Sequence, residues 1–375
     1  MSISDYFTKE FSIKSLTKGT TILDAICCLI DNSLDAAEKR KKEKINIKIF
    51  LDKDQLLIMD NALGISLDEA KSNMLKVGEK NSFKDLYGNG MKKAILVIGK
   101  DVEIRAVKDK LAINIKLNVL DKKDNQLWEP QFSDEVYAEE EDSFLIRISN
   151  FRRDMIKIMK KGRNHNFINE LKQRLGYKYR YIIKSNKANI VINGDVLEAR
   201  YVEATKVAEK NKTIDGMKII VKLFKDIKDK SENGADFIIN DRCVVEKEKS
   251  NKISWGMKIR KRGHSYVKFY GEVLIDADDI ETLGVNPSRN KINFSTHKFN
   301  EVLKFMLDVI EENRNAYKKG SITVQLEIDE EEYLELKNIL ESRQFNRIPY
   351  ECAKDVVEYI YDLGVNKVKE HDQDL

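Results

Sequence analysis

The hydrophobic period of the chain changes from helical to extended within its first 50 residues. Ile22, Ile26 and Ile30 recur at the spacing of one helix face, and the pattern predicts a helix over residues 22–42. Residues 45–49 then alternate apolar and polar side chains with the period of a strand. Elements that each carry one apolar face must pack against one another in layers. We therefore expect an α+β fold in this region.

Further strand and helix patterns fall into two groups along the chain. The first group has strand patterns at residues 55–59, 102–107, 111–117 and 144–148 and an apolar run at 91–98. The second has helix patterns at residues 167–175 and 299–310 and strand patterns at 188–192, 217–223, 235–239 and 266–275. The composition shifts again at residue 321. We predict a first domain over residues 1–160, a second α+β domain over residues 161–318 and a small C-terminal α/β module over residues 319–375.

The composition is that of packed domains. The 375 residues include 67 basic and 63 acidic side chains, a net charge of +4, and 42% are hydrophobic. These values exclude a highly charged disordered chain. The sequence has no apolar stretch of membrane-spanning length and no secretory signal, so we expect no membrane partner. The four cysteines form no CxxC pair, and we expect reduced thiols, no structural zinc and a cytoplasmic location.

Three short segments contain residue types that suit nucleotide binding. Ile30–Ala36 lies on the predicted helix, Asp60–Gly64 follows a strand pattern, and Tyr87–Lys92 opens a helix. The side-chain carbonyl of an Asn suits a hard cation such as Mg²⁺ that bridges phosphates. An Asp at a strand end can accept a hydrogen bond from the amino group of a base, and a glycine lets the base approach the backbone. A Gly-x-Gly at a helix start directs backbone N–H groups at phosphate.

Each segment alone is more typical of a solvated helix face, a hairpin corner or a turn. The three in this order, however, resemble the motifs of the GHKL superfamily, which includes gyrase B subunits, heat-shock ninety chaperones, histidine kinases, MutL and MORC proteins. Ile30–Ala36 is similar to the N-box of that family. Asp60–Gly64 is similar to its adenine-binding box, with Ala62 where the family has its first Gly. Tyr87–Lys92 is similar to its phosphate-binding box.

The resemblance covers residues 15–110 by motif and reaches residue 310 by fold. It implies a Bergerat-type α/β sandwich that binds ATP, followed by a transducer-like α+β domain and the small C-terminal α/β module. Residues 97–101, four residues after the third segment, look most like MORC ATPases.

The resemblance implies roles toward ATP and Mg²⁺ for the matching residues. Asn32 would hold Mg²⁺ against the triphosphate, Asp60 would bind the adenine amino group, and Gly64 would let the base pack on the backbone. The glycines of the third segment would cradle the phosphates, Lys92 would add positive charge, and residues 66–86 would form a lid over ATP. The further candidates for nucleotide binding are Asp35, Ile65, Lys80, Ser82, Gly88, Asn89, Gly90, Met91, Ser143 and Lys291.

Two departures from the family pattern bear on the chemistry. Hydrolysing members carry a Glu four residues before the N-box Asn, where it orients and activates water, and this chain has Cys28 there. A thiol is a poor substitute for a carboxylate base, and Asp31 faces another side of a helix. We therefore expect tight ATP–Mg²⁺ binding with slow or absent hydrolysis. Ser143 stands where the family often has the Thr of a Gly-Thr pair, and we expect it to supply that hydroxyl.

The second domain contains a candidate for the phosphate-sensing loop of the family. In gyrase B and MutL a transducer domain donates a Lys to the γ-phosphate, and residues 286–294 are the best match to that loop here. Arg289 and Lys291 can meet phosphate charge. A solvated basic turn is the alternative interpretation.

Clusters of basic residues, some with tyrosines between them, suit the backbone of a nucleic-acid partner. They lie at residues 160–163 and 258–264, and at 174–184, where tyrosines alternate with basic residues. A solvated face is the alternative, because the net charge is only +4.

The leading hypothesis is an ATP-operated conformational switch. Two protomers would close at residues 1–20 as a homodimer and pass the signal through the second domain to DNA or a protein partner. One alternative is an active MORC- or chaperone-like ATPase with an unrecognised base. The other is a non-catalytic interaction protein on a GHKL scaffold.

Overall fold

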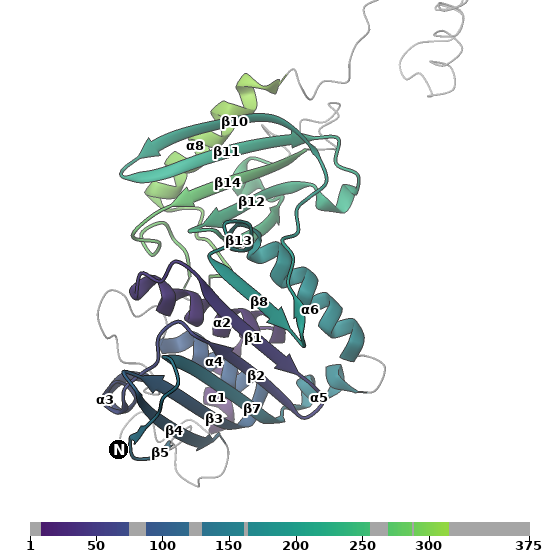
Figure 1. Cartoon of the computed structure of the whole chain (residues 1–375). Coiled ribbons are helices and arrows are strands. Elements are labelled where there is room, and N and C mark those ends of the chain that lie inside the picture. The colour runs from purple at the N-terminus through teal and green to yellow at the C-terminus, as the bar shows by residue number, and fades with distance from the viewer. Residues whose placement is uncertain are drawn as a thin grey trace, which may run out of the picture. The chain divides into compact units, whose positions relative to one another are not determined.

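The computed structural model describes residues 9–74, 88–119, 130–160, 164–255, 269–286 and 289–314. The chain divides into two compact units, Met1–Lys318 and Lys319–Leu375, and the described residues all lie in the first. That unit contains two β-sheets, each with an apolar core of its own (Figure 1). The predicted α+β class is confirmed. The elements predicted for the C-terminal module lie outside the described residues.

The first sheet has nine strands in the order β5-β4-β3-β7-β2-β1-β8-β9, with β6 paired to β4. Strands β1 and β8 pair in parallel, and the other neighbours are antiparallel. The strands are β1 (Ile45–Leu51), β2 (Gln55–Asp60), β3 (Gly99–Lys108), β4 (Leu111–Asn118), β5 (Gln131–Phe132), β6 (Val136–Tyr137), β7 (Ser143–Phe151), β8 (Ala188–Ile192) and β9 (Asp195–Val196).

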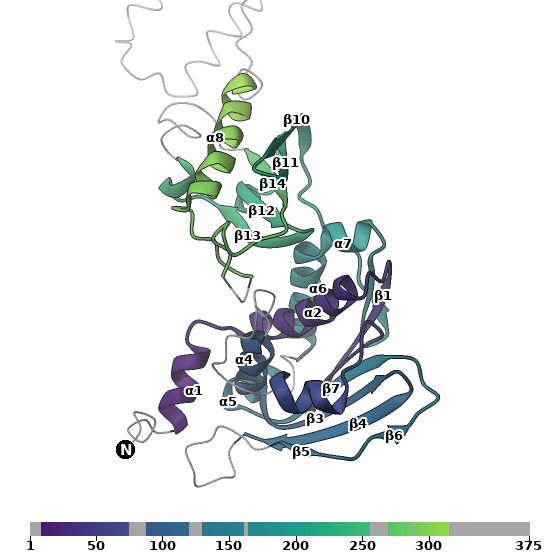
Figure 2. The same cartoon turned by 90° about the vertical axis from the view of Figure 1, so that its left-hand side faces the viewer.

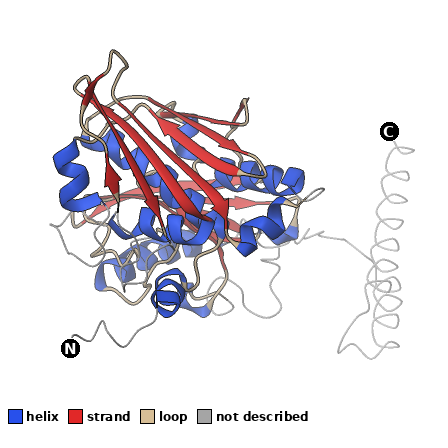
Figure 3. Cartoon of the chain, turned by 90° about the horizontal axis from the view of Figure 1, so that it is seen from below, coloured by secondary structure: helices blue, strands red, loops and turns tan. Residues whose placement is uncertain are grey.

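Helices cover one face of this sheet. Helices α2 and α4 lie next to each other on that face, and their buried side chains share one core with β1, β2 and β7 (Figure 2). Viewed from below, helices and strands form separate layers (Figure 3). The helices of this region are α1 (Lys9–Thr17), α2 (Ile22–Lys39), the short α3 (Leu67–Glu69), which continues as a π-helix (Ala70–Met74), α4 (Gly88–Ile98), α5 (Arg153–Met159), α6 (Asn164–Lys178) and α7 (Arg180–Lys184).

Helix α2 begins and ends at local signals. The Thr21 hydroxyl accepts a hydrogen bond from the Asp24 N–H at 3.0 Å, and the Asp24 carboxylate accepts one from the Thr21 N–H at 3.2 Å. This capping box satisfies two of the free N–H groups at the helix start. The helix ends at Lys39, three residues before the predicted end, because Lys41 adopts a left-handed conformation with φ of 56°.

The second sheet has five strands in the order β10-β11-β14-β12-β13. Helix α8 (His297–Glu312) packs on one face. The apolar residues that recur at helical spacing in its sequence are all buried: Phe299, Val302, Leu303, Met306, Val309 and Ile310. Short 3₁₀ helices lie at Lys230–Glu232 and Asn251–Ile253. The strands are β10 (Thr205–Ile214), β11 (Met217–Lys225), β12 (Gly234–Ile239), β13 (Arg242–Glu248) and β14 (Tyr270–Asp276).

Strand β8 shows that the first sheet continues past the predicted domain boundary at residue 160. Ile190 of β8 pairs with Ile47 of β1 in the first sheet. The sequence Asn193-Gly194 after the strand pattern at residues 188–192 predicts a tight turn, and the structure confirms it: the two residues have φ of 50° and 91° and connect β8 to β9. The boundary itself stays a prediction, but α6, α7 and β8 connect the two sheets in the chain.

A buried polar network holds α7 to the second sheet. The Arg180 guanidinium is fully buried and donates hydrogen bonds at 2.8 Å to the carboxylates of Asp236 and Glu272. The Tyr177 hydroxyl donates to Asp236 at 2.5 Å, and the Tyr181 hydroxyl donates to Glu272 at 2.5 Å. Two buried carboxylates thus share one guanidinium and the tyrosine hydroxyls.

This network corrects the interpretation of residues 174–184 as a nucleic-acid surface. Tyr177, Tyr179 and Arg180 are buried, so they present no stacking platform and no free charge at the surface. The alternative interpretation, a solvated face, is wrong for the same residues. Of the other basic clusters, residues 161–163 and 258–264 lie outside the described residues.

The network predicts unequal effects for two arginine substitutions. We expect Arg180→Ala to lower the free energy of unfolding by about 3–5 kcal/mol, because it leaves two carboxylates buried without their cation. Arg147 pairs with Glu103 at 3.2 Å, and both side chains are almost half exposed. We expect Arg147→Ala to cost less than about 1 kcal/mol. Urea unfolding followed by circular dichroism measures both, and equal losses would contradict the assigned role of Arg180.

Candidate functional site

Helix α2 places Asn32 between residues that face different neighbours. Asn32 is half-buried, and its side chain makes no hydrogen bond with any residue that the structure describes. Ser33 and Asp31, directly beside it, are both buried and hydrogen-bonded. The amide of Asn32 is therefore available for a ligand, as an N-box Asn requires.

Asp60 is held against α2 by the residue that follows Asn32. It is the last residue of β2 and only 4% exposed. Its Oδ2 accepts a hydrogen bond from the Ser33 hydroxyl at 2.6 Å, and its Oδ1 accepts one from the Ala62 N–H at 2.9 Å. Burial raises the pKa of Asp60, and these two hydrogen bonds oppose the increase. The sequence interpretation included Ser33 in the N-box but gave it no role.

Gly64 makes a close backbone contact that no other residue could make. A Cβ atom at this position would lie 1.7 Å from the carbonyl oxygen of Val107, near the end of β3. The glycine is thus required by the packing of the chain on β3. The contact of adenine with this backbone stays a prediction. Ile65, which follows, is partly buried against the first core.

The first turn of α4 contacts α2 one turn before Asn32. A Cβ on Gly90 would lie 3.6 Å from the Cβ of Cys28, at ordinary van der Waals distance. Met91 and Lys92, which follow, are buried. Gly88 and Asn89 form the start of the helix, where backbone N–H groups have no partner in the preceding turn. The structure therefore brings the third segment to the same helix as the second.

The three predicted segments meet on α2. Asp60 contacts Ser33, one residue after Asn32, and Gly90 lies against Cys28, four residues before it. One turn of helix spans about 5.4 Å, so both contacts lie within one turn of Asn32 along α2.

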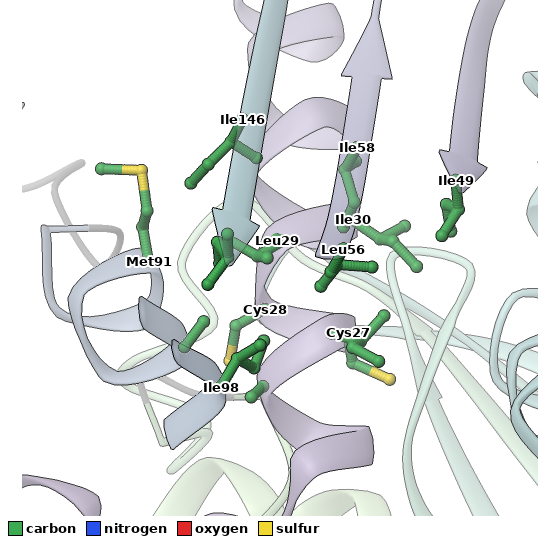
Figure 4. Packing of buried hydrophobic residues seen from close by; sticks show 14 of the residues in the cluster. Cys27, Cys28, Leu29, Ile30, Ile49, Leu56, Ile58, Met91, Ile98 and Ile146 are labelled. Carbon is green, nitrogen blue, oxygen red and sulfur yellow. The ribbon is translucent and has the colours of Figure 1, made fainter. Parts of the chain in front are cut away.

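Cys28 is a buried thiol that remains protonated. It lies on the side of α2 that faces α4, and Cys27 points to another side (Figure 4). Burial, and after it the nearby carboxylate of Asp31, raise the pKa of Cys28 to about 12. A thiol with this pKa is not a proton acceptor at neutral pH.

Asp35 does not face the same neighbours as Asp60. Its Oδ1 is 2.7 Å from Nη1 of Arg242 and 3.0 Å from Nη1 of Arg289. Burial raises the pKa of Asp35 to about 7, and the attraction to Arg242 opposes this increase. The structure therefore assigns Asp35 cationic protein partners, and its predicted contact with nucleotide stays untested.

The remaining candidates lie at different places. Ser143 is the first residue of β7, next to Phe144, which is the cross-strand partner of Asp60. Lys291 is exposed, and the candidate phosphate loop instead presents Arg289 to α2. Lys80 and Ser82 lie outside the described residues, as does most of the predicted lid.

The described residues contain no group of three or more His, Cys, Asp or Glu side chains arranged around a metal ion. A Mg²⁺ ion that bridges phosphates needs only one or two protein ligands, so this finding leaves the predicted role of Asn32 open. No helix in the described part of the chain is long and apolar enough to cross a membrane.

Comparison with known families agrees with the three segments. Residues 20–144 match the model of the histidine kinase-, DNA gyrase B- and HSP90-like ATPases. This match supports a GHKL-type ATPase domain in that part of the chain. The matched range contains all three segments and both Cys28 and Ser143. No curated protein matches the chain.

The burial of the described cysteines predicts slow alkylation of the native protein. At pH 8 a pKa of about 12 leaves roughly one thiolate in ten thousand at Cys28. Burial also raises the pKa of Cys27 and of Cys243. We expect iodoacetamide to label these three residues much more slowly in native than in denatured protein. Peptide mass spectrometry after timed quenching measures each rate, and fast native labelling of Cys28 would contradict its assigned burial.

Proposed function

We propose that the GHKL-type domain binds ATP with Mg²⁺ and serves as a conformational switch with slow or absent hydrolysis. The observation that carries the proposal is the contact of Asp60 and Gly90 with α2 within one turn of Asn32. The match of residues 20–144 to the ATPase family supports nucleotide binding in the same region.

The residues at this place fit the parts of an ATP–Mg²⁺ complex. Asn32 has a side-chain amide without a protein partner among the described residues, and its oxygen suits Mg²⁺. Each oxygen of Asp60 accepts a single hydrogen bond and can accept another from an amino group. The start of α4 offers backbone N–H groups and the positive end of the helix dipole to phosphate. When bound, Mg²⁺ would neutralise part of the triphosphate charge.

The proposal of slow hydrolysis rests on Cys28. Activation of water requires a group that accepts a proton near neutral pH. The Cys28 thiol stands at the position of the family's Glu, and its pKa of about 12 keeps it protonated. Asp31, the carboxylate nearest to Cys28 in the sequence, forms an ion pair with Lys178 and accepts a hydrogen bond from the Tyr179 hydroxyl.

We further propose that the switch controls association with other molecules. By resemblance to MORC-like proteins, ATP would favour a homodimer closed at residues 1–20 and coupled to DNA or a protein partner. A cytoplasmic location agrees with the predicted reduced state of the thiols.

Calorimetry of ATP binding tests the site directly. We expect Asp60→Asn to weaken ATP binding by about 10-fold or more, because a hydrogen bond to a charged acceptor contributes about 1.5–3 kcal/mol. Asn32→Ala should abolish the increase in affinity that Mg²⁺ gives. Asp54→Asn, an equivalent change at an exposed position of the same hairpin, is the control and should bind ATP normally. Equal affinities in all these variants, or no binding by the native protein, would contradict the proposal.

Substitution at Cys28 tests the account of hydrolysis. We expect Cys28→Glu to increase ATP turnover, because it places a carboxylate one helix turn before Asn32. Cys28→Gln has the same size without a basic group and should stay as slow as the native protein. Phosphate release under steady-state conditions measures both. Ordinary ATPase rates in the native protein that Asn32→Ala abolishes would show that another base acts.

A further inference from the structure

Two acidic residues of α2, Asp31 and Asp35, form a buried charge cluster with three later parts of the chain. Asp31 and Asp35 lie one turn apart and are each 5% exposed. Arg242, the first residue of β13, has Nη1 at 2.7 Å from Asp35 Oδ1 and Nε at 3.8 Å from Asp31 Oδ1. Lys178, the last residue of α6, has Nζ at 3.4 Å from Asp31 Oδ2. The Tyr179 hydroxyl donates to Asp31 at 3.1 Å.

Arg289 reaches this cluster from a turn between Val285 and Ile292, of which the structure describes residues 285–286 and 289–292. The turn is closed by a bridge between Val285 and Ile292 and by the Asn286 side chain, which accepts hydrogen bonds from two N–H groups of the turn at 3.0 and 2.9 Å. Arg289 has φ of 46°, a conformation that is unfavourable for residues other than glycine. Its Nη1 lies 3.0 Å from Asp35 Oδ1. The closed turn therefore directs this side chain at α2.

Some polar atoms of the cluster are buried without a hydrogen-bond partner among the described residues. Both arginines use the same oxygen of Asp35, while its other oxygen, Oδ2, is buried without a hydrogen bond to any described residue. Nε of Arg242 is also buried and has no hydrogen-bond partner in the described part of the chain. A guanidinium and a carboxylate form two parallel hydrogen bonds when their orientation allows it. A small displacement of α2 can thus exchange a single bond for a paired one at this contact.

We propose that Asp35 anchors α2 to the second sheet, and that Arg242 and Arg289 are positioning residues that couple the turn at residues 285–292 to occupancy of the nucleotide site. This inference rests on the proposed function. Asp35 is three residues from Asn32 on the same helix, so a ligand that shifts Asn32 also shifts Asp35. Coupling between two sites is reciprocal, and changes in the anchor alter ATP affinity as ATP alters the anchor.

Hydrogen exchange and calorimetry together test the coupling at pH 8. The full chain is compared without and with saturating ATP–Mg²⁺, in the native form and as Arg289→Gln, Asp35→Asn and the double variant. Arg289→Gln leaves Arg242 on Asp35, so this variant keeps the buried carboxylate paired if Asp35→Asn does not fold. The control is Lys187→Gln, because Lys187 and Asp241 form an exposed ion pair at 2.6 Å between the same two regions.

We expect ATP to change the exchange rate of peptides that contain residues 285–292 in the native protein and in Lys187→Gln. Arg289→Gln should lose this response and bind ATP about fivefold or more weakly, within the usual range of coupling between sites. The fold-loss of ATP affinity in the double variant should be smaller than the product of the fold-losses in the two single variants, because both substitutions break the same Asp35–Arg289 ion pair. A turn that serves stability alone would show no response to ATP.

Two results would overturn the inference, and they are distinguishable. If the native protein binds ATP but the turn shows no response, the coupling is wrong and the proposed function stands. If calorimetry detects no ATP binding by the native protein, the proposed function fails and the coupling fails with it.

Discussion

Two buried carboxylates on α2 determine which residues of the neighbouring elements can pack against that helix. Asp31 and Asp35 cannot be buried as ions unless cations or hydrogen-bond donors accompany them. Lys178, Arg242 and Arg289 supply these charges from α6, from the start of β13 and from the turn at residues 285–292. The second sheet is therefore bound to α2 by ion pairs, in addition to the apolar cores that each sheet forms for itself.

Other residues of the same helix organise the candidate nucleotide site. Ser33 holds the end of β2 through Asp60, and Cys28 lies against the first turn of α4 at Gly90. Asn32 lies between these contacts, and its side-chain amide has no hydrogen-bond partner among the residues that the structure describes. Because one helix carries both sets of contacts, a ligand bound at Asn32, as we propose, would act on the same helix as the ion pairs at Asp35. This arrangement is the reason that we propose a switch.

Local signals in the sequence were sufficient for much of the fold. The apolar period around Ile26 and the Asn193-Gly194 turn each depend on neighbours a few residues away, and the structure confirms both. The role of Asp35 and the burial of Arg180 could not be found in this way, because their partners are distant in sequence. A charged residue with a distant partner has the same local pattern as a solvated one. Gly64 was predicted as a site residue from its position in a sequence motif. Its close contact with Val107 could not be predicted in this way, because that contact depends on the packing of β3.

The most direct test of the account is a crystal structure of the protein with Mg²⁺ and a non-hydrolysable ATP analogue. We expect the base beside Asp60, the metal on the side-chain oxygen of Asn32 and the phosphates at the start of α4. An analogue bound elsewhere, or bound without contact to α2, would contradict the convergence of the three segments on that helix.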